Sequence, residues 1–287
     1  MTNSHKAFEW SSRLLPFLII AGLLVPGNAW IAQEIRTFAG LTTVLILPGY
    51  ALARGLRLFE RFDNWLDALS LSVALTWSVG LVLWLLFFFL GFSLQSISWL
   101  WIGFAFVGLI ISAFIPLPNQ LESRFHNTWL GRGTITWIFL LVLIAYLYGS
   151  LMTGDAYSYM SWLRNITAGD IQPSVNIHAS WETNHPFFKN LYAPTLLYYA
   201  VSSFLARVDP NWIWTHAPAF WVPVMLAIQF SLTYKLFERK TVGYAAIFLS
   251  PLAGGLLSLF SRLGNSHTIC NFIFLPMAFW LFLIAIS

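Results

Sequence analysis

Residues 68–121 read ALSLSVALTWSVGLVLWLLFFFLGFSLQSISWLWIGFAFVGLIISAFIPLPNQL and contain no Asp, Glu, Lys or Arg over 54 positions. A helix needs about 20 consecutive apolar residues to cross the hydrocarbon core of a bilayer. The stretch is therefore long enough for two crossings, with Gly91-Phe92-Ser93 as the natural turn between them. It predicts two membrane-spanning helices joined by a short connection.

The composition of the whole chain extends this conclusion. Charged residues make up 9% of the 287 residues, against about 25% in soluble domains. Hydrophobic residues reach 58%, and the mean hydropathy is +0.71. A soluble fold of this size has too little interior to hide so much apolar surface. These values exclude a soluble enzyme, a secreted disulfide scaffold and a disordered chain, and they predict an all-α polytopic membrane protein.

Other classes of partner and site are also excluded. The net charge is +4, but the basic residues are spread between the apolar stretches, so no nucleic-acid partner is expected. A lone cysteine, Cys270, excludes an internal disulfide and is expected to be a small apolar core residue.

Stretches without Asp, Glu, Lys or Arg give the expected number of spans. They cover 14–33, 37–53, 68–121, 133–154, 190–206, 210–234, 241–261 and 263–287. We expect about eight spans, with the ionisable groups outside them. The first stretch, broken by Pro26-Gly27-Asn28, also fits a signal peptide.

The role of residues 190–206 sets the orientation of everything downstream. If this segment lies along or dips into the outer interface, ten basic residues fall inside and five outside; if it spans, the numbers are nine and six. The first arrangement obeys the positive-inside rule better. It places both chain ends on the cytoplasmic side of a plasma membrane, most simply a prokaryotic one, and residues 153–211 on the outer side.

Three segments follow from this topology. Residues 1–118 form a four-span N-terminal membrane module, residues 119–132 a cytoplasmic linker, and residues 133–287 a core with one span, the outer loop 153–211 and three further spans.

The outer loop gathers ionisable residues. We expect an interfacial helix in its first part, because Ala156, Tyr159, Met160, Leu163, Ile166 and Thr167 fall at helical spacing and form one membrane-facing stripe. Asp155, at the start of this helix, either caps it or holds a reactive carboxylate at the level of the lipid headgroups.

Two further sets of residues in the loop each have a structural and a functional interpretation. His178, Glu182 and His185 are spaced so that one helical face presents all three to a metal, while Asn184 and Pro186 favour a solvated polar loop instead. Arg164 and Lys189 either pair with phosphate oxygens or anchor the chain at the interface.

The order of these features resembles the first outer loop of the GT-C glycosyltransferases, which include the protein O-mannosyltransferases and the aminoarabinose transferases. Gly154-Asp155 ends a span and precedes the amphipathic YSYMSWLRNITAGDI of residues 157–171. An aromatic and proline segment follows at 185–199, and the basic YKLFERK at 234–240 is similar to the cytoplasmic end of the family's second core span. In addition, LPGYAL at 47–52 resembles an uncharacterised membrane module found ahead of glycosyltransferase-like proteins.

The resemblance implies transfer of a sugar, with inversion, from a polyprenyl-phosphate-linked donor to an acceptor at the extracytoplasmic face. It implies Asp155 as the catalytic base or as ligand of a divalent cation. Arg164 and Lys189 then lie near the phosphate, and Tyr159, Glu182 and His185 contact the substrate.

The chain departs from the family in two respects. Asp155 is followed by Ala156, not by a second acid, and the sequence ends at Ser287, where family members continue with further spans. We therefore expect a fragment, a truncated copy, or one half of a split protein whose partner subunit supplies further spans. Two rival functions remain: a flippase or transporter of a lipid-linked sugar, and a non-catalytic membrane scaffold.

Overall fold

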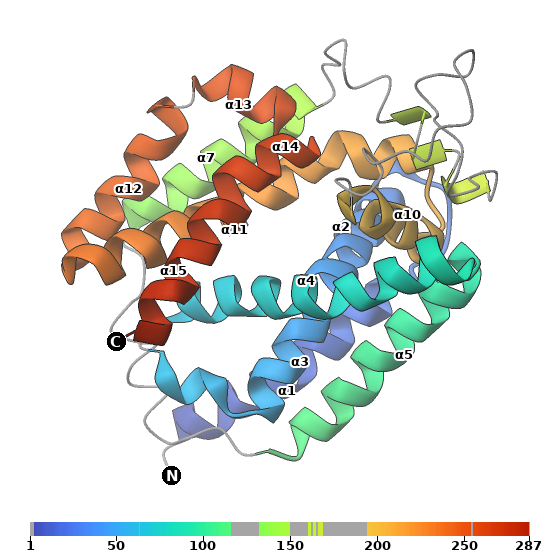
Figure 1. Ribbon diagram of the computed structural model, residues 1–287, viewed down its shortest axis with the longest axis horizontal. Coiled ribbons are helices and arrows are strands. Elements are labelled where there is room, and N and C mark those ends of the chain that lie inside the picture. The colour runs from blue at the N-terminus through green and yellow to red at the C-terminus, as the bar shows by residue number, and fades with distance from the viewer. Residues whose placement is uncertain are drawn as a thin grey trace.

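A computed structural model shows the protein as a bundle of helices (Figure 1). The structure describes residues 3–62, 64–115, 132–149, 160–161, 163–164, 166–168, 194–253 and 255–286. Within these residues every regular element is a helix and there is no strand, which confirms the predicted helical class.

The helices of the N-terminal half are α1 (Asn3–Gly22), α2 (Trp30–Leu45), α3 (Leu47–Gly55), the short 3-10 helix η1 (Leu58–Arg61), α4 (Trp65–Leu90) and α5 (Leu94–Ala113). Those of the C-terminal half are α7 (Arg132–Gly149), α10 (Pro194–Ala206), α11 (Pro210–Phe237), α12 (Lys240–Ala253), α13 (Leu256–Arg262), α14 (Ser266–Ile269), the π-helical turn η3 (Cys270–Phe274) and α15 (Leu275–Ile286).

Three of the described helices, α4, α5 and α11, are long and apolar enough to cross a membrane. Two bent pairs raise the number to five when each is taken as one span: α2 with α3, bent by 43°, and α12 with α13, bent by 84°. The chain therefore has the helices of a membrane protein.

The turn between α4 and α5 lies where the sequence predicts it. Gly91 ends α4 with a positive φ of 66°, a conformation that costs glycine little. Ser93 then caps α5, its hydroxyl accepting a hydrogen bond from the Ser96 amide at 3.1 Å. The two helices of the long uncharged stretch are thus separated by local backbone chemistry.

Helices α7 and α11 are antiparallel neighbours. The C-terminal part of α7 meets the N-terminal part of α11, with the rings of Tyr146 and His216 4.9 Å apart. The other end of α7 lies along α12, where the indole of Trp137 donates to the carbonyl of Ile247 at 3.3 Å. Helices α7 and α11 run side by side in opposite directions (Figure 1). Gly149, the last residue of α7, and Pro210, the first residue of α11, therefore lie at the same end of the bundle.

Helix α10 falls in the segment expected to lie along or dip into the outer interface, and its burial contradicts the first of these two alternatives. Its 13 residues extend over about 20 Å, too short to cross a bilayer. However, residues 195–203 are buried on all sides, so no face of this stretch is left to lie on lipid. The helix packs against α2, where Ser202 donates to the carbonyl of Gly40 at 3.5 Å. The segment enters the bundle and does not rest on its surface.

Two other expectations about burial are wrong. Met160, Leu163 and Ile166 are 6%, 0% and 4% exposed and belong to the main hydrophobic core, so these three residues of the predicted membrane-facing stripe face protein. Helical spacing defines an apolar face but does not say whether lipid or protein covers it. Cys270, expected in the core, is exposed at the start of η3.

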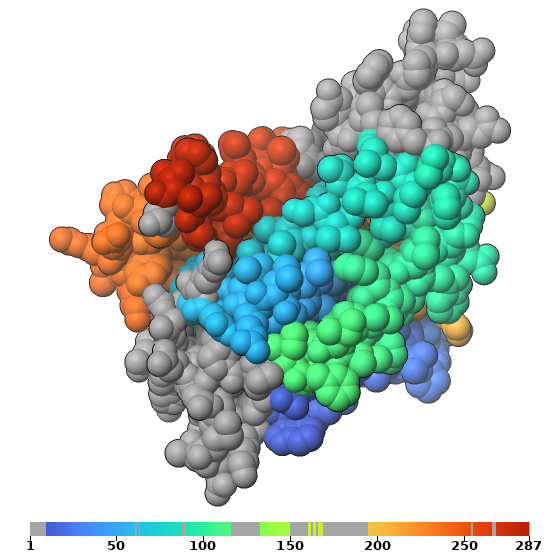
Figure 2. Space-filling model, turned by 60° about the horizontal axis from the view of Figure 1, so that its bottom comes forward, coloured from blue at the N-terminus to red at the C-terminus, as the bar shows by residue number. Residues whose placement is uncertain are grey.

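Close packing of α3 on α4 depends on one glycine. A Cβ added at Gly49 would overlap the backbone carbonyl oxygen of Ser72, and the Gly49 amide donates to Thr76 Oγ1 at 2.9 Å. Figure 2 shows α3, in light blue, lying between α4 and α5. The glycine of the LPGYAL segment is thus required by helix packing.

We predict that Gly49→Ala lowers the free energy of unfolding by roughly 3 kcal/mol, because backbone atoms must move to relieve the overlap. Gly103→Ala in α5 is the matched control, since nothing lies within 4 Å of its added Cβ. Thermal unfolding of both variants in detergent measures the effect. Equal midpoints for the two would show that α3 does not pack this closely.

Candidate functional site

A buried carboxylate and a histidine join α2 to α11. Glu34 Oε1 lies 3.1 Å from His216 Nε2, and the two side chains are 12% and 9% exposed. The hydroxyl of Tyr146, from α7, donates to the same carboxylate oxygen at 2.9 Å. We call these three residues the Glu34 cluster. It brings together three helices that are far apart in the sequence.

The cluster contradicts the expectation that ionisable groups lie outside the helices. Sequence analysis placed Glu34 and Arg36 in a gap between two spans, but α2 begins at Trp30 and runs without a break to Leu45. Both residues therefore lie within the helix, and Arg36 is only 8% exposed. His216 lies inside the stretch 210–234, which contains no Asp, Glu, Lys or Arg but does contain this histidine.

The imidazole of His216 has polar neighbours at both nitrogens. Its Nδ1 lies 2.7 Å from the carbonyl oxygen of Trp212 and 3.0 Å from Thr215 Oγ1. Its Nε2 faces Glu34 Oε1, and a proton between these two atoms makes the contact attractive. This pairing makes the burial of the two groups tolerable.

Aromatic rings enclose the imidazole. The indole of Trp212 stacks on His216 with centroids 4.8 Å apart, and the rings of Tyr146 and Phe38 lie at 4.9 and 6.5 Å. These rings close the imidazole off on the sides that Glu34 does not occupy.

One oxygen of the carboxylate remains unused. Glu34 Oε2 is buried and has no hydrogen-bond partner among the described residues. Glu34 also lines a groove of about 490 Å³ between α1 and α2, in which it is the one ionisable side chain among the described lining residues. The carboxylate therefore has a free acceptor next to an otherwise apolar groove.

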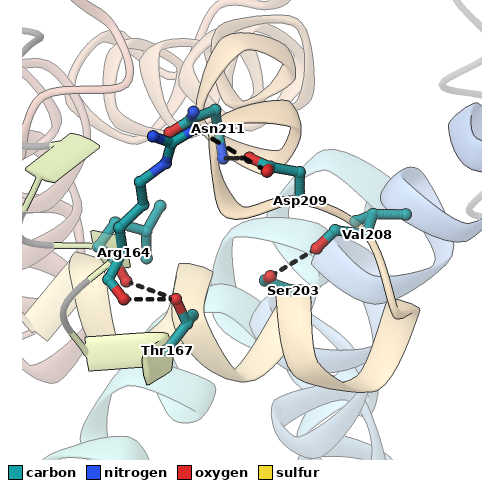
Figure 3. Close-up of polar contacts among 7 residues, drawn as sticks. Arg164, Thr167, Ser203, Val208, Asp209 and Asn211 are labelled. Atoms are coloured by element: carbon teal, nitrogen blue, oxygen red, sulfur yellow. Dashed lines mark hydrogen bonds and ion pairs between the residues drawn. The ribbon is translucent and has the colours of Figure 1, made fainter. Parts of the chain in front are cut away.

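Of the site residues predicted from sequence, Arg164 is described by the structure. Its guanidinium lies 3.9 Å from Asp209 Oδ2, and with the Asn211 amide oxygen turned toward it, that oxygen accepts from Arg164 Nη2 and, at 3.0 Å, from Nε. Asp209 also caps α11, accepting from the Asn211 amide at 2.8 Å. Figure 3 shows Arg164 reaching from the segment that contains Thr167 to the start of α11.

The side chains of Arg164 and Asp209 are 59% and 60% exposed, so solvent reaches both. Asn211 precedes His216 by five residues, about one and a half helical turns. Arg164 and the Glu34 cluster therefore occupy the same end of the bundle.

The other predicted site residues, Asp155, Tyr159, His178, Glu182, His185 and Lys189, lie outside the described residues. Among the described residues no three His, Cys, Asp or Glu side chains come together to hold a metal. The Glu34 cluster was missed because Glu34 and His216 are 182 positions apart in the sequence; counting histidine as ionisable would have marked His216 within its apolar stretch.

Comparisons of the chain with family models, with curated proteins and with solved structures find no match.

We predict that His216→Leu lowers the free energy of unfolding by roughly 3 kcal/mol, because it leaves the Glu34 carboxylate buried without its partner. The double variant Glu34→Leu/His216→Leu should recover a large part of this loss, since it removes both polar groups. Denaturation of the two single variants and the double variant in detergent provides a double-mutant cycle. Strictly additive effects would mean that the two side chains do not interact.

Proposed function

We propose that the protein is a polytopic membrane glycosyltransferase of the GT-C type, acting at the extracytoplasmic face on a polyprenyl-phosphate-linked sugar. The observation that carries this proposal is the packing of residues 160–168 against the start of α11 through Arg164. Met160 comes five positions after Asp155 in the sequence, and the buried Glu34 cluster lies at the same end of the bundle. Polar side chains of the described residues thus gather at the end of the bundle where α7 stops at Gly149.

The proposal includes eight crossings in alternating directions. They are α1, the bent pair α2 with α3, α4, α5, α7, α11, the pair α12 with α13, and the run from α14 to α15. The antiparallel contact of α7 and α11 supports it, because it returns the chain to the side from which it left. The topology that places ten basic residues on the cytoplasmic side requires the same opposite directions for α7 and α11.

The proposed reaction is a displacement at the anomeric carbon of the sugar. The acceptor oxygen forms a bond to that carbon while the bond to the phosphate oxygen breaks, and the configuration inverts. Asp155 takes the proton of the acceptor hydroxyl, with a divalent cation as the alternative partner of this carboxylate. Arg164 and Lys189 offset the charge of the departing polyprenyl phosphate.

The remaining predicted residues complete the substrate contacts. We assign Tyr159, Glu182 and His185 to the substrate side, with His178 as a further metal-ligand candidate. The Glu34 cluster joins the N-terminal module to the core at this end, because it fixes α2, α7 and α11 relative to one another. A second membrane subunit, supplying further spans, remains part of the proposal.

A lipid-linked sugar flippase is the second candidate, and the presence of a buried ionisable pair in the bundle favours it. Ion-coupled transport needs ionisable groups inside the bundle, and the Glu34–His216 pair is such a group. The 84° bend between α12 and α13, which follows Pro251, is also a feature of broken transporter helices, whereas α11 continues unbroken through Pro218 and Pro223.

We predict that Asp155→Asn lowers transfer of a labelled sugar from a polyprenyl-phosphate donor by at least about 100-fold, the usual contribution of a general base. Asp170→Asn, which changes another acid of the same outer loop, is the matched control and should keep its activity. Both are assayed in membranes with equal amounts of protein. Full activity of Asp155→Asn would remove this carboxylate from the chemistry, and lipid flux in proteoliposomes without any transfer would favour the flippase.

We predict opposite accessibility for two exposed positions. In a Cys270→Ser background, Ser161→Cys should react with a membrane-impermeant maleimide in intact cells, and Glu238→Cys should react only after permeabilisation. Ser161 belongs to the outer loop, and Glu238 follows α11 at its other end. Labelling of Glu238→Cys from outside would contradict the topology.

A further inference from the structure

Helix α2 carries a buried arginine without a partner among the described residues. Arg36 is 8% exposed, its Nε is buried, and no hydrogen bond or ion pair joins its guanidinium to a residue that the structure describes. Glu34 is not its counter-charge, because side chains two positions apart on a helix do not face each other and Glu34 pairs with His216. A buried cation is costly without a counter-charge, so we expect Arg36 to bind an anion.

The direction of α10 along α2 shows what surrounds this arginine. The ring of Trp101 lies 6.0 Å from that of Tyr198, in the first half of α10, and its indole donates to the carbonyl of Val44, near the end of α2, at 3.1 Å. A Cβ added at Gly40 would lie 3.1 Å from the Cβ of Ala206, the last residue of α10. The two helices are therefore antiparallel, and α10 ends beside the middle of α2.

Arg36 lies next to the turn that joins α10 to α11. It is four residues, about one helical turn, closer to the start of α2 than Gly40, and so lies beyond the level of Ala206. Side chains on a helix tilt toward its N-terminus. The guanidinium of Arg36 is therefore directed toward the end of the bundle where α2 and α11 begin, at the turn of residues 207–209.

Positive charge prevails around this turn. Arg207 lies in the turn and is exposed, and the exposed guanidinium of Arg164 reaches the turn, 3.9 Å from Asp209 Oδ2. Asp209 is the one acid of residues 206–211, and its Oδ1 already accepts from the Asn211 amide at 2.8 Å. Three arginines, including Arg36, against one carboxylate leave a formal surplus of two positive charges.

We propose that Arg36 binds the phosphate group of a membrane lipid or lipid carrier at this turn. A phosphate monoester carries about −1.5 to −2 charges at neutral pH, which matches the surplus. A planar guanidinium donates to two phosphate oxygens at once. Lipid phosphates lie just beyond the hydrocarbon core, and α11, which starts at Pro210, is long and apolar enough to cross that core. The site does not involve Asp155 and does not require sugar transfer.

Native mass spectrometry of the full chain in mild detergent tests this binding with two pairs of lipids. Polyprenyl phosphate is compared with polyprenol, and phosphatidic acid with diacylglycerol of the same chains. In at least one pair the intact protein should bind the phosphate form at least about tenfold more tightly, as expected for charge-assisted hydrogen bonds, and Arg36→Met should abolish the difference. A preference in the prenyl pair identifies a lipid carrier, and one in the diacyl pair a phospholipid. Arg57→Met, which removes an exposed arginine outside this turn, is the control and should keep the preference.

The unfolding midpoint of delipidated protein gives a second readout. Because the chain supplies no counter-charge, Arg36→Met should keep or raise the midpoint, and the preferred phosphate lipid should raise the midpoint of the intact protein but not of this variant. The proposal is overturned if neither pair shows a preference, or if Arg36→Met retains it. It is also overturned if Arg36→Met unfolds at a lower temperature or fails to fold, since a partner within the chain would then hold the arginine. Equally tight binding of inorganic phosphate would show a site for the free ion and would contradict the lipid assignment.

Discussion

Polar groups inside a membrane-like bundle must find partners within the protein, and this constraint shapes the whole structure. Most hydroxyls inside the helices bind the carbonyl one turn earlier, as Ser72 does with Ala68 at 2.7 Å and Ser78 with Ala74 at 2.9 Å. Ionisable groups cannot be satisfied so locally. Glu34 needs His216 and Tyr146 from two other helices, so one ion pair brings together segments that the sequence keeps far apart.

The same constraint gives the two ends of the bundle different chemistry. At one end Glu34 pairs with His216, one oxygen of its carboxylate has no hydrogen-bond partner among the described residues, and Arg164 reaches the start of α11 nearby. At the other end Arg54 is buried and donates to the neutral groups of Ser12, Tyr50 and Ile115. The apolar helices between them keep these polar groups apart.

Sequence alone predicted the features that depend on composition and local chemistry. The helical class follows from the scarcity of charges, and the turn at Gly91-Phe92-Ser93 follows from a glycine and a capping serine. Features that depend on which helices meet were not predicted. The amphipathic spacing of Met160, Leu163 and Ile166 was recognised correctly, but their cover turned out to be protein and not lipid. Likewise, a charge-free interval could not show that α2 extends back across Glu34 and Arg36, because their burial depends on neighbours such as His216.

The central claim is that Glu34, His216 and the loop that begins with Asp155 share one end of the bundle. An electron cryomicroscopy structure of the protein in a lipid nanodisc tests it most directly. The account predicts Glu34 and His216 within hydrogen-bonding distance, with Asp155 beyond the same ends of α7 and α11 and level with the lipid headgroups. Glu34 facing the acyl chains without His216, or Asp155 at the end where Arg54 lies, would contradict it.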